Sequence, residues 1–117
     1  LSFFYDSNAL WITPFPQNLK IILINNKGGS IFRIIDGPSD ASELEHFFEA
    51  KHNLNAGNIA KTFGLDYTLC DNQIDLEVNL KVLFDQKNQK PFLLEVVTNN
   101  ELNPDILKRY FQAIKNS

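Results

Sequence analysis

Residues 20–29 read KIILINNKGG, an apolar run followed by two asparagines, a lysine and two glycines. The run Ile21–Ile24 is continuous and has polar residues only at its ends, which is typical of a strand buried on both faces of a parallel sheet. Asn25–Ser30 is rich in turn-forming residues, and Ile31–Ile35 is again largely apolar. We therefore predict a strand over Lys20–Asn25 that ends in a polar, glycine-containing turn.

The same residues also fit a β-hairpin, because Asn and Gly tolerate the positive φ angles of tight turns between two apolar runs. Against a hairpin, the first run is continuously apolar and the second is interrupted only by Arg33, whereas a half-exposed hairpin would alternate apolar and polar residues. Taken alone, residues 20–35 leave both interpretations open.

The rest of the chain alternates helices and strands. A short aromatic-rich helix is predicted over residues 3–11, and strands over Tyr67–Cys70 and Pro91–Thr98. Apolar residues recur at helical spacing after four candidate helix starts, which are Ser39 or Asp40, Asn55, Asp71 or Asn72, and Asn103. The last helix has a predicted buried stripe of Leu107, Tyr110, Phe111 and Ile114. Strands separated by helices predict an α/β fold, with a parallel sheet and flanking helices in one domain over residues 1–117.

Composition excludes several classes of protein. The chain has 117 residues, 44% hydrophobic and 21% charged, which is typical of a soluble globular domain. A net charge of −3 and a pI near 5.2 argue against nucleic acid or an anionic membrane as a partner. Its apolar runs are too short for a membrane span. The single cysteine, Cys70, excludes an internal disulfide and fits a reducing compartment, so we expect a cytoplasmic protein.

The Asn-Asn-Lys-Gly-Gly turn contains groups that suit Mg²⁺ and phosphate. Mg²⁺ takes oxygen ligands in a tight octahedron and usually bridges a few protein oxygens to phosphates. The side-chain oxygen of Asn26 can supply one ligand, and the carbonyl of Gly28 another if the loop curls back. Gly29 lets the backbone approach closely and offers an N–H group to a phosphate oxygen. If the strand is parallel, this turn lies at its carboxyl end, where ligands of such sheets bind.

These features resemble the thiamine diphosphate-dependent enzymes, which carry a Gly-Asp pair, about two dozen residues, and then Asn-Asn at the end of the next strand. Asn25-Asn26 stands at that distance from the start of the chain. With the opening LSFFYDSNAL (1–10), the segment INNKGGSIF (24–32) and the Phe47, Phe48 and His52 region, the chain is similar to the 2-succinyl-5-enolpyruvyl-6-hydroxy-3-cyclohexene-1-carboxylate synthases of menaquinone biosynthesis. We therefore expect the Gly-Asp pair to precede Leu1.

The resemblance implies that the chain is the C-terminal part of the diphosphate-binding domain of a larger enzyme. That enzyme, a transferase, would decarboxylate 2-oxoglutarate and add the succinyl unit to isochorismate. Its cofactors would be thiamine diphosphate and Mg²⁺, with Mn²⁺ as an alternative ion. The chain's partners would be the remaining domains of the same polypeptide, within a homo-oligomer. In this family the glutamate that activates the cofactor belongs to the other cofactor-binding domain. The isolated chain is therefore expected to be inactive.

The resemblance also assigns roles to individual residues. The metal ligands would be the Asn26 side chain and the Gly28 carbonyl, and no catalytic residue is assigned. The other assigned positions are those at the cofactor, Leu1, Ser2, Asn26, Gly28, Gly29 and Ser30, and those lining the substrate pocket, Ile31, Phe32 and Ile35. Lys27 departs from the small or amide residue expected at its position.

Other hypotheses and other tempting residues remain. The chain could come from a different thiamine diphosphate enzyme, of the acetolactate synthase or 2-oxoacid decarboxylase type, or be a non-catalytic α/β binding module. His46 and His52 stand near several glutamates, but their spacing favours a charged helix face over a metal site. Cys70 has no neighbouring base at motif spacing, so it is interpreted as a buried structural thiol.

Overall fold

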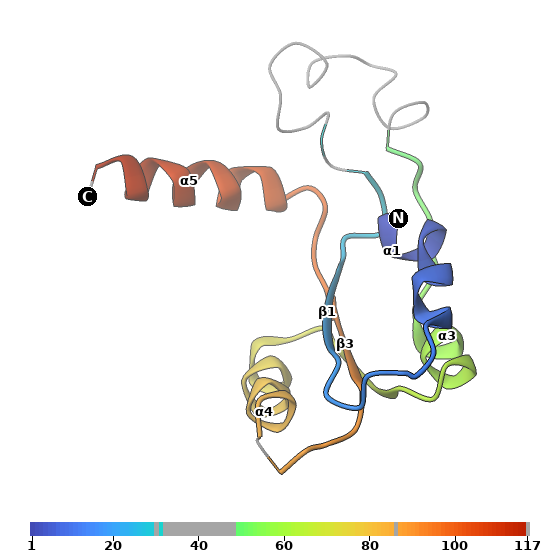
Figure 1. Ribbon diagram of the computed structural model, residues 1–117. Helices are drawn as coiled ribbons and strands as arrows, with labels where there is room; N and C mark the ends of the chain where they lie inside the picture. The colour runs from blue at the N-terminus through green and yellow to red at the C-terminus, as the bar shows by residue number, and fades with distance from the viewer. Residues whose placement is uncertain (30, 32–48, 86, 117) are drawn as a thin grey trace. The chain divides into compact units, whose positions relative to one another are not determined.

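The fold was analysed in a computed structural model, which describes residues 1–29, 31, 49–85 and 87–116 (Figure 1). The chain forms two compact units, which are described separately below. The first unit comprises Leu1–Asn25 and Leu54–Val97, and the second comprises Asn26–Asn53 and Thr98–Ser117.

A three-stranded sheet forms the centre of the first unit. Its strands are β1 (Lys20–Asn25), β2 (Asp66–Cys70) and β3 (Phe92–Val97), in the order β1-β3-β2. Both pairs are parallel, and Asn25 at the end of β1 lies opposite Val97 at the end of β3. The predicted parallel α/β fold and the bounds of β1 are therefore confirmed. Because β1 pairs with β3 in parallel, the sheet supports the strand-and-turn interpretation of residues 20–29 over the hairpin.

The helices of the first unit begin and end largely where the sequence predicts. The predicted helix over 3–11 is divided into α1 (Ser2–Tyr5) and a 3-10 helix, η1 (Ser7–Trp11). The helix α3 (Gly57–Thr62) follows Asn55, whose Oδ1 accepts the Gly57 N–H at 3.2 Å. It is followed by Gly64, which has a φ of 70°.

The helix α4 (Gln73–Leu83) has the predicted N-cap, since Asn72 Oδ1 accepts the Asp75 N–H at 3.0 Å. The helix predicted after Ser39 or Asp40 lies outside the described residues. In the part of the chain that is described, no helix has the length and apolar character needed to cross a membrane.

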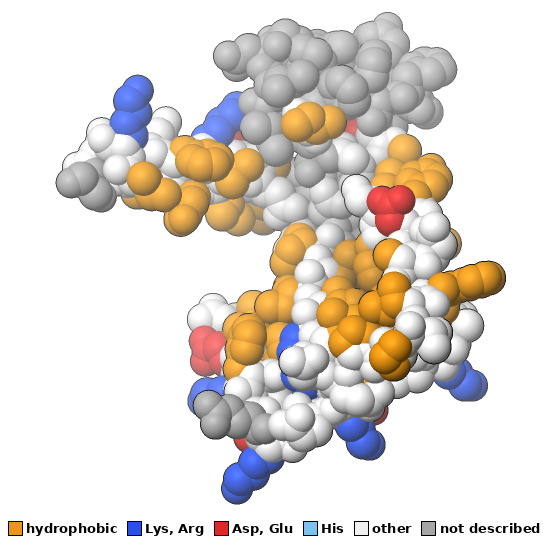
Figure 2. Space-filling model, in the orientation of Figure 1, with side chains coloured by type: hydrophobic (Ala, Val, Ile, Leu, Met, Phe, Trp, Pro, Cys, Tyr) orange, Lys and Arg blue, Asp and Glu red, His pale blue; other side chains and the backbone are white. Residues whose placement is uncertain are grey.

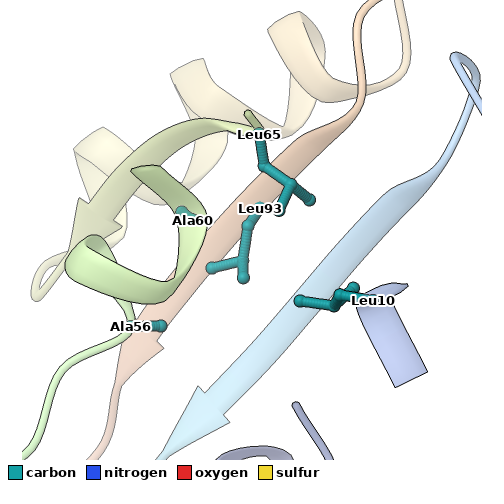
Figure 3. Close-up of a cluster of buried hydrophobic side chains, with 5 residues drawn as sticks. All are labelled: Leu10, Ala56, Ala60, Leu65 and Leu93. Atoms are coloured by element: carbon teal, nitrogen blue, oxygen red, sulfur yellow. The ribbon is translucent and has the colours of Figure 1, made fainter. Parts of the chain in front are cut away.

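Apolar side chains on the two faces of the sheet pack against different helices. On one face, Leu93 of β3 packs with Leu10 of η1, Ala56, Ala60 of α3, and Leu65 (Figure 3). The opposite face carries a second cluster in which α4 covers β2 and β3, formed by Cys70, Leu76, Leu80, Leu83, Phe92, Leu94 and Val96. The central strand β3 is therefore enclosed on both faces.

The strand β1 is less buried than the sequence predicts. Ile22 and Ile24 are 45% and 58% exposed, so the prediction that both faces of this strand are covered is wrong for this structure. The physical reason is position, because β1 is an edge strand among the described strands and α4 packs over β2 and β3. Figure 2 accordingly shows hydrophobic side chains at the surface of this unit.

The last helix, α5 (Asn103–Lys115), belongs to the second unit. It starts at the predicted residue, with Pro104 in its first turn. Its apolar stripe is exposed, however, since Tyr110 and Phe111 are each 59% accessible and Ile114 is similarly open. The prediction that this stripe is buried is therefore wrong for the described residues.

Cys70 lies at the end of β2 and is 1% exposed, which supports its interpretation as a structural thiol. Burial raises the pKa of this thiol. A hydrogen bond from Asn79 lowers the pKa in part, and the nearby Asp75 and Asp71 carboxylates raise it again. We expect dithionitrobenzoate to label the native chain at least about 100-fold more slowly at pH 8 than the urea-unfolded chain. In the native chain the raised pKa lowers the fraction of thiolate, and burial keeps the reagent from the sulfur atom. Equal rates would contradict the packing of Cys70.

Candidate functional site

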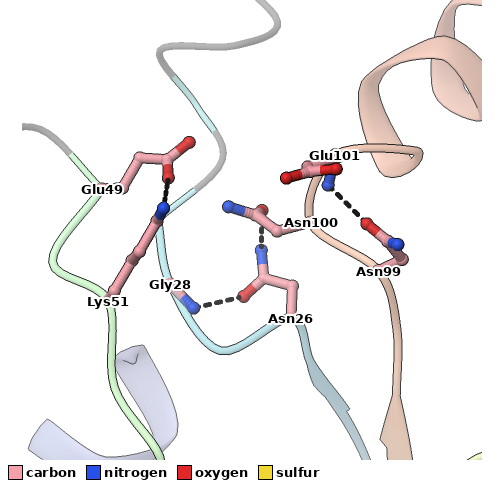
Figure 4. A network of polar contacts seen from close by, with 7 residues as sticks. All are labelled: Asn26, Gly28, Glu49, Lys51, Asn99, Asn100 and Glu101. Carbon is pink, nitrogen blue, oxygen red and sulfur yellow. Dashed lines mark hydrogen bonds and ion pairs between the residues drawn. The ribbon is translucent and has the colours of Figure 1, made fainter. Parts of the chain in front are cut away.

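The turn that follows β1 opens the second unit, and hydrogen bonds of the Asn26 side chain lie within it. Its Oδ1 accepts the Gly28 N–H at 3.3 Å, and its Nδ2 donates to Asn100 Oδ1 at 3.3 Å (Figure 4). The first bond brings the Asn26 side-chain oxygen back over the peptide two residues later. The turn therefore brings Asn26 Oδ1 to the N–H of Gly28, whereas the predicted ligand at that residue is its carbonyl oxygen.

Gly28 has little room for a side chain. A Cβ atom at this position would lie 3.1 Å from the carbonyl oxygen of Glu49 and 3.5 Å from Asn100 Nδ2. The first of these neighbours is backbone, which can move only if residue 49 moves with it. Glycine at position 28 is thus explained by close approach of two segments of backbone.

Residues 49–52 run beside the turn and hold it in place. The Gly29 N–H donates to the Glu49 carbonyl, and the His52 N–H donates to the Lys27 carbonyl at 3.0 Å. Glu49 is fully buried and its Oε2 lies 3.8 Å from Lys51 Nζ. Glu49 and His52 therefore support the turn through their backbones. The prediction that they lie on a charged helix face is wrong for these two residues. His46 lies outside the described residues.

The contact made by Gly29 changes one predicted role. The Gly29 N–H was predicted to donate to a phosphate oxygen, whereas in this structure it donates to the backbone carbonyl of Glu49. Gly29 therefore contributes to the turn by pairing it with residues 49–52.

The remaining predicted site residues are placed in part. Leu1 and Ser2 stand at the start of α1 in the first unit, where the Leu1 carbonyl accepts the Phe4 and Tyr5 N–H groups. Ile31 is 57% exposed. Ser30, Phe32 and Ile35 lie outside the described residues.

A second Asn-Asn pair, which was not predicted from the sequence to belong to the site, lies near the turn. Asn25 is the last residue of β1 and Asn26 the first after it, while Asn99 and Asn100 follow the end of β3 at Val97 by two and three residues. An Asn-Asn pair therefore stands near the end of each of two neighbouring parallel strands. Asn100 holds the Asn26 side chain, and Asn99 Oδ1 accepts the Glu101 N–H at 2.8 Å (Figure 4). The signal was available, because ends of adjacent parallel strands meet at one edge of a sheet.

A buried carboxylate in the first unit was also missed. Glu95 of β3 is 0% exposed, and its oxygens accept hydrogen bonds from Asn25, Ala56 and Tyr67. Burial, with the hydrogen bond to the Glu95 carboxylate and its negative charge, raises the pKa of Tyr67, so this phenol stays protonated. In the sequence, Glu95 is marked only as a charged residue within the apolar run FLLEVV.

The donor set of the turn fits a Mg²⁺ ion that also binds phosphate. The described residues contain no group of three or more His, Cys, Asp or Glu side chains that could enclose a metal. Asn26 Oδ1 and the Gly28 carbonyl are neutral oxygens in one turn, and they would leave the remaining positions of an octahedron to phosphate, water and further ligands. Such a site would add no negative charge beside a diphosphate.

The conformation of Lys27 can be tested independently of any ligand. Its φ of 59° lies in the left-handed region, which is costly for a lysine and better tolerated by asparagine. We expect Lys27→Asn to raise the free energy of unfolding by about 0.5–1 kcal/mol in a urea titration. Lys61→Asn, within the helix α3, is the matched control and should lower it slightly. A loss of stability in both variants would contradict strain at Lys27.

Comparisons with known proteins give one consistent result. No family model matches the chain. It is 44% identical over 117 residues, its whole length, to a 2-succinyl-5-enolpyruvyl-6-hydroxy-3-cyclohexene-1-carboxylate synthase of Cytophaga hutchinsonii, covering 21% of that protein. Proteins of the same name from Christiangramia forsetii and Flavobacterium johnsoniae are 40% and 44% identical over 98% and 97% of the chain, which covers 20% of each. The chain thus spans about a fifth of the length of the curated relatives it matches.

Proposed function

This chain is homologous over its whole length to one segment of the 2-succinyl-5-enolpyruvyl-6-hydroxy-3-cyclohexene-1-carboxylate synthases, and from that premise we propose that it forms the Mg²⁺ and diphosphate side of a thiamine diphosphate site. The observation that carries this proposal is the 44% identity along all 117 residues. The α/β fold, with Asn26 directly after a parallel strand, supports it.

In the proposed site, Asn26 Oδ1 and the Gly28 carbonyl would hold the Mg²⁺ beside the diphosphate. When bound, thiamine diphosphate supplies the chemistry of decarboxylation and carbon–carbon bond formation. The chain's own residues place that group. Asn100 orients the Asn26 amide, and the pairing of residues 49–52 with the turn holds Gly28 in position. Ser30, Leu1 and Ser2 remain proposed contacts of the cofactor.

The proposed reaction of the full-length protein is a transfer, in which 2-oxoglutarate is decarboxylated and its succinyl unit is added to isochorismate. This reaction would belong to menaquinone biosynthesis, and the single cysteine of the chain agrees with a cytoplasmic enzyme. Ile31, Phe32 and Ile35 are proposed to line the substrate pocket. The remaining domains of the polypeptide, in a homo-oligomer, would supply the groups that activate the cofactor, so the 117 residues alone should not turn over substrate.

The test is a steady-state assay of the full-length protein with thiamine diphosphate and Mg²⁺. We expect release of CO₂ from 2-oxoglutarate that is coupled to consumption of isochorismate and is abolished by EDTA. Turnover of pyruvate in place of 2-oxoglutarate would assign the protein to the acetolactate synthase or decarboxylase type. Absence of both turnover and cofactor binding would favour a non-catalytic module.

A further inference from the structure

Glu95 is a charged side chain in the most enclosed part of the sheet. It lies in the middle of β3, between β1 and β2, and its exposed fraction is 0%. Burying a carboxylate is strongly unfavourable unless it is hydrogen-bonded, and an apolar residue at the same position would hold three strands together at lower cost. The hydrogen bonds that Glu95 makes therefore need an explanation beyond packing.

Three donors from separate parts of the chain meet this carboxylate. Oε1 accepts Asn25 Nδ2 at 2.6 Å, and Oε2 accepts the Tyr67 hydroxyl at 2.7 Å and the Ala56 N–H at 2.8 Å. Tyr67 belongs to β2, and Ala56 stands immediately before α3. Hydrogen bonds to an ionised acceptor are short and strong, so Glu95 fixes its partners in direction as well as in distance.

Asn25 is the partner that connects this network to the turn. Its Nδ2 donates both to Glu95 Oε1 and to the Leu54 carbonyl at 2.9 Å, so both amide hydrogens have acceptors. Asn25 is 4% exposed and is the last residue of β1. Since β1 is an edge strand among the described strands, its end is held on one side by β3 and by this amide.

We propose that Glu95 is a positioning residue for the metal-binding turn, acting through Asn25, which is bonded directly to Asn26. This inference rests on the proposed function, because it gives Glu95 a role only if Asn26 binds the metal. Glu95 itself touches neither metal nor cofactor in this proposal. Its contribution is to fix the residue from which the turn departs, as outer ligand-holding groups do in other metal sites.

The test uses Glu95→Gln in the full-length protein. Glutamine has the shape of glutamate, but its NH₂ group cannot accept a hydrogen bond. Where this group replaces Oε1, it faces the Asn25 amide, and the hydrogen bond to Asn25 is weakened. We expect the dissociation constant for Mg²⁺, measured by calorimetry in the presence of thiamine diphosphate, to rise about 10-fold. Asn25→Ala removes the same contact from the other side and should have an effect of similar size. The double variant should be no worse than either single variant.

Tyr67→Phe is the matched control, because it removes one donor from the same carboxylate and leaves the Asn25 contact in place. It should lower thermal stability while the Mg²⁺ dissociation constant stays within about twofold of wild type. If Tyr67→Phe weakens Mg²⁺ binding as much as Glu95→Gln, the network is only structural and the inference fails.

Asn26→Ala separates failure of this inference from failure of the proposed function. Normal Mg²⁺ affinity in Glu95→Gln and Asn25→Ala, together with weakened affinity in Asn26→Ala, would overturn the role of Glu95 alone. Normal affinity in all three variants would overturn the metal site as well. If Glu95→Gln does not fold, Asn25→Ala decides the question, since it leaves Glu95 its other two donors.

Discussion

Asn26→Ala in the full-length protein is expected to weaken Mg²⁺-dependent binding of thiamine diphosphate by at least about 100-fold, because it removes a proposed metal ligand and not merely a group that orients one. The fold should survive, since the hydrogen bonds of the Asn26 side chain to the Gly28 N–H and to Asn100 Oδ1 are long, at 3.3 Å each. Calorimetry with the cofactor at fixed Mg²⁺ gives the affinity, and circular dichroism checks the fold.

Asn58→Ala is the matched control for this substitution. Asn58 is an exposed residue within α3, in the first unit, and alanine suits a helix at least as well. Its cofactor affinity should equal that of the wild type. An Asn26→Ala protein that binds cofactor and Mg²⁺ normally would show that the metal is held elsewhere.

Leu93→Ala is expected to produce the largest loss of stability. Leu93 is 0% exposed at the centre of β3, where it packs against side chains from η1 and α3 (Figure 3). Replacing its isobutyl side chain by a methyl group loses apolar burial and leaves a cavity, which costs about 2–5 kcal/mol at such sites. The free energy of unfolding, from urea titration followed by circular dichroism, should fall by that amount.

Leu69→Ala provides the comparison, because it makes the same chemical change on the neighbouring strand β2 at a residue that is 42% exposed. Its loss should be under about 1.5 kcal/mol, in proportion to the smaller area removed from contact. Equal losses at the two positions would contradict the assignment of Leu93 to the core.

Features that depend on near neighbours in the chain were predicted well from the sequence. The N-cap at Asn72 and the glycine that follows α3 each depend on a few consecutive residues. The strand over Lys20–Asn25 was also predicted with its observed bounds, because its apolar run is flanked by polar residues. The exposure of this strand was not predicted, because it depends on which strands and helices lie beside it in the fold.

The groups that support the candidate site were not predicted, because their contacts join distant parts of the chain. Glu95 meets donors at positions 25, 56 and 67, and no local pattern in FLLEVV specifies them. The pairing of residues 49–52 with the turn is likewise a long-range contact. The sequence therefore predicted the proposed ligands, Asn26 and Gly28, but not the residues that hold them.

The most direct test of the metal site is the anomalous scattering of Mn²⁺ in crystals of the full-length protein grown with thiamine diphosphate. Mn²⁺ takes the same kinds of oxygen ligand as Mg²⁺, whose bonds to oxygen are about 2.1 Å long. We expect one anomalous peak within about 2.5 Å of both Asn26 Oδ1 and the Gly28 carbonyl oxygen. A peak that is bound by other residues, with the Asn26 side chain turned away from it, would contradict the proposed site.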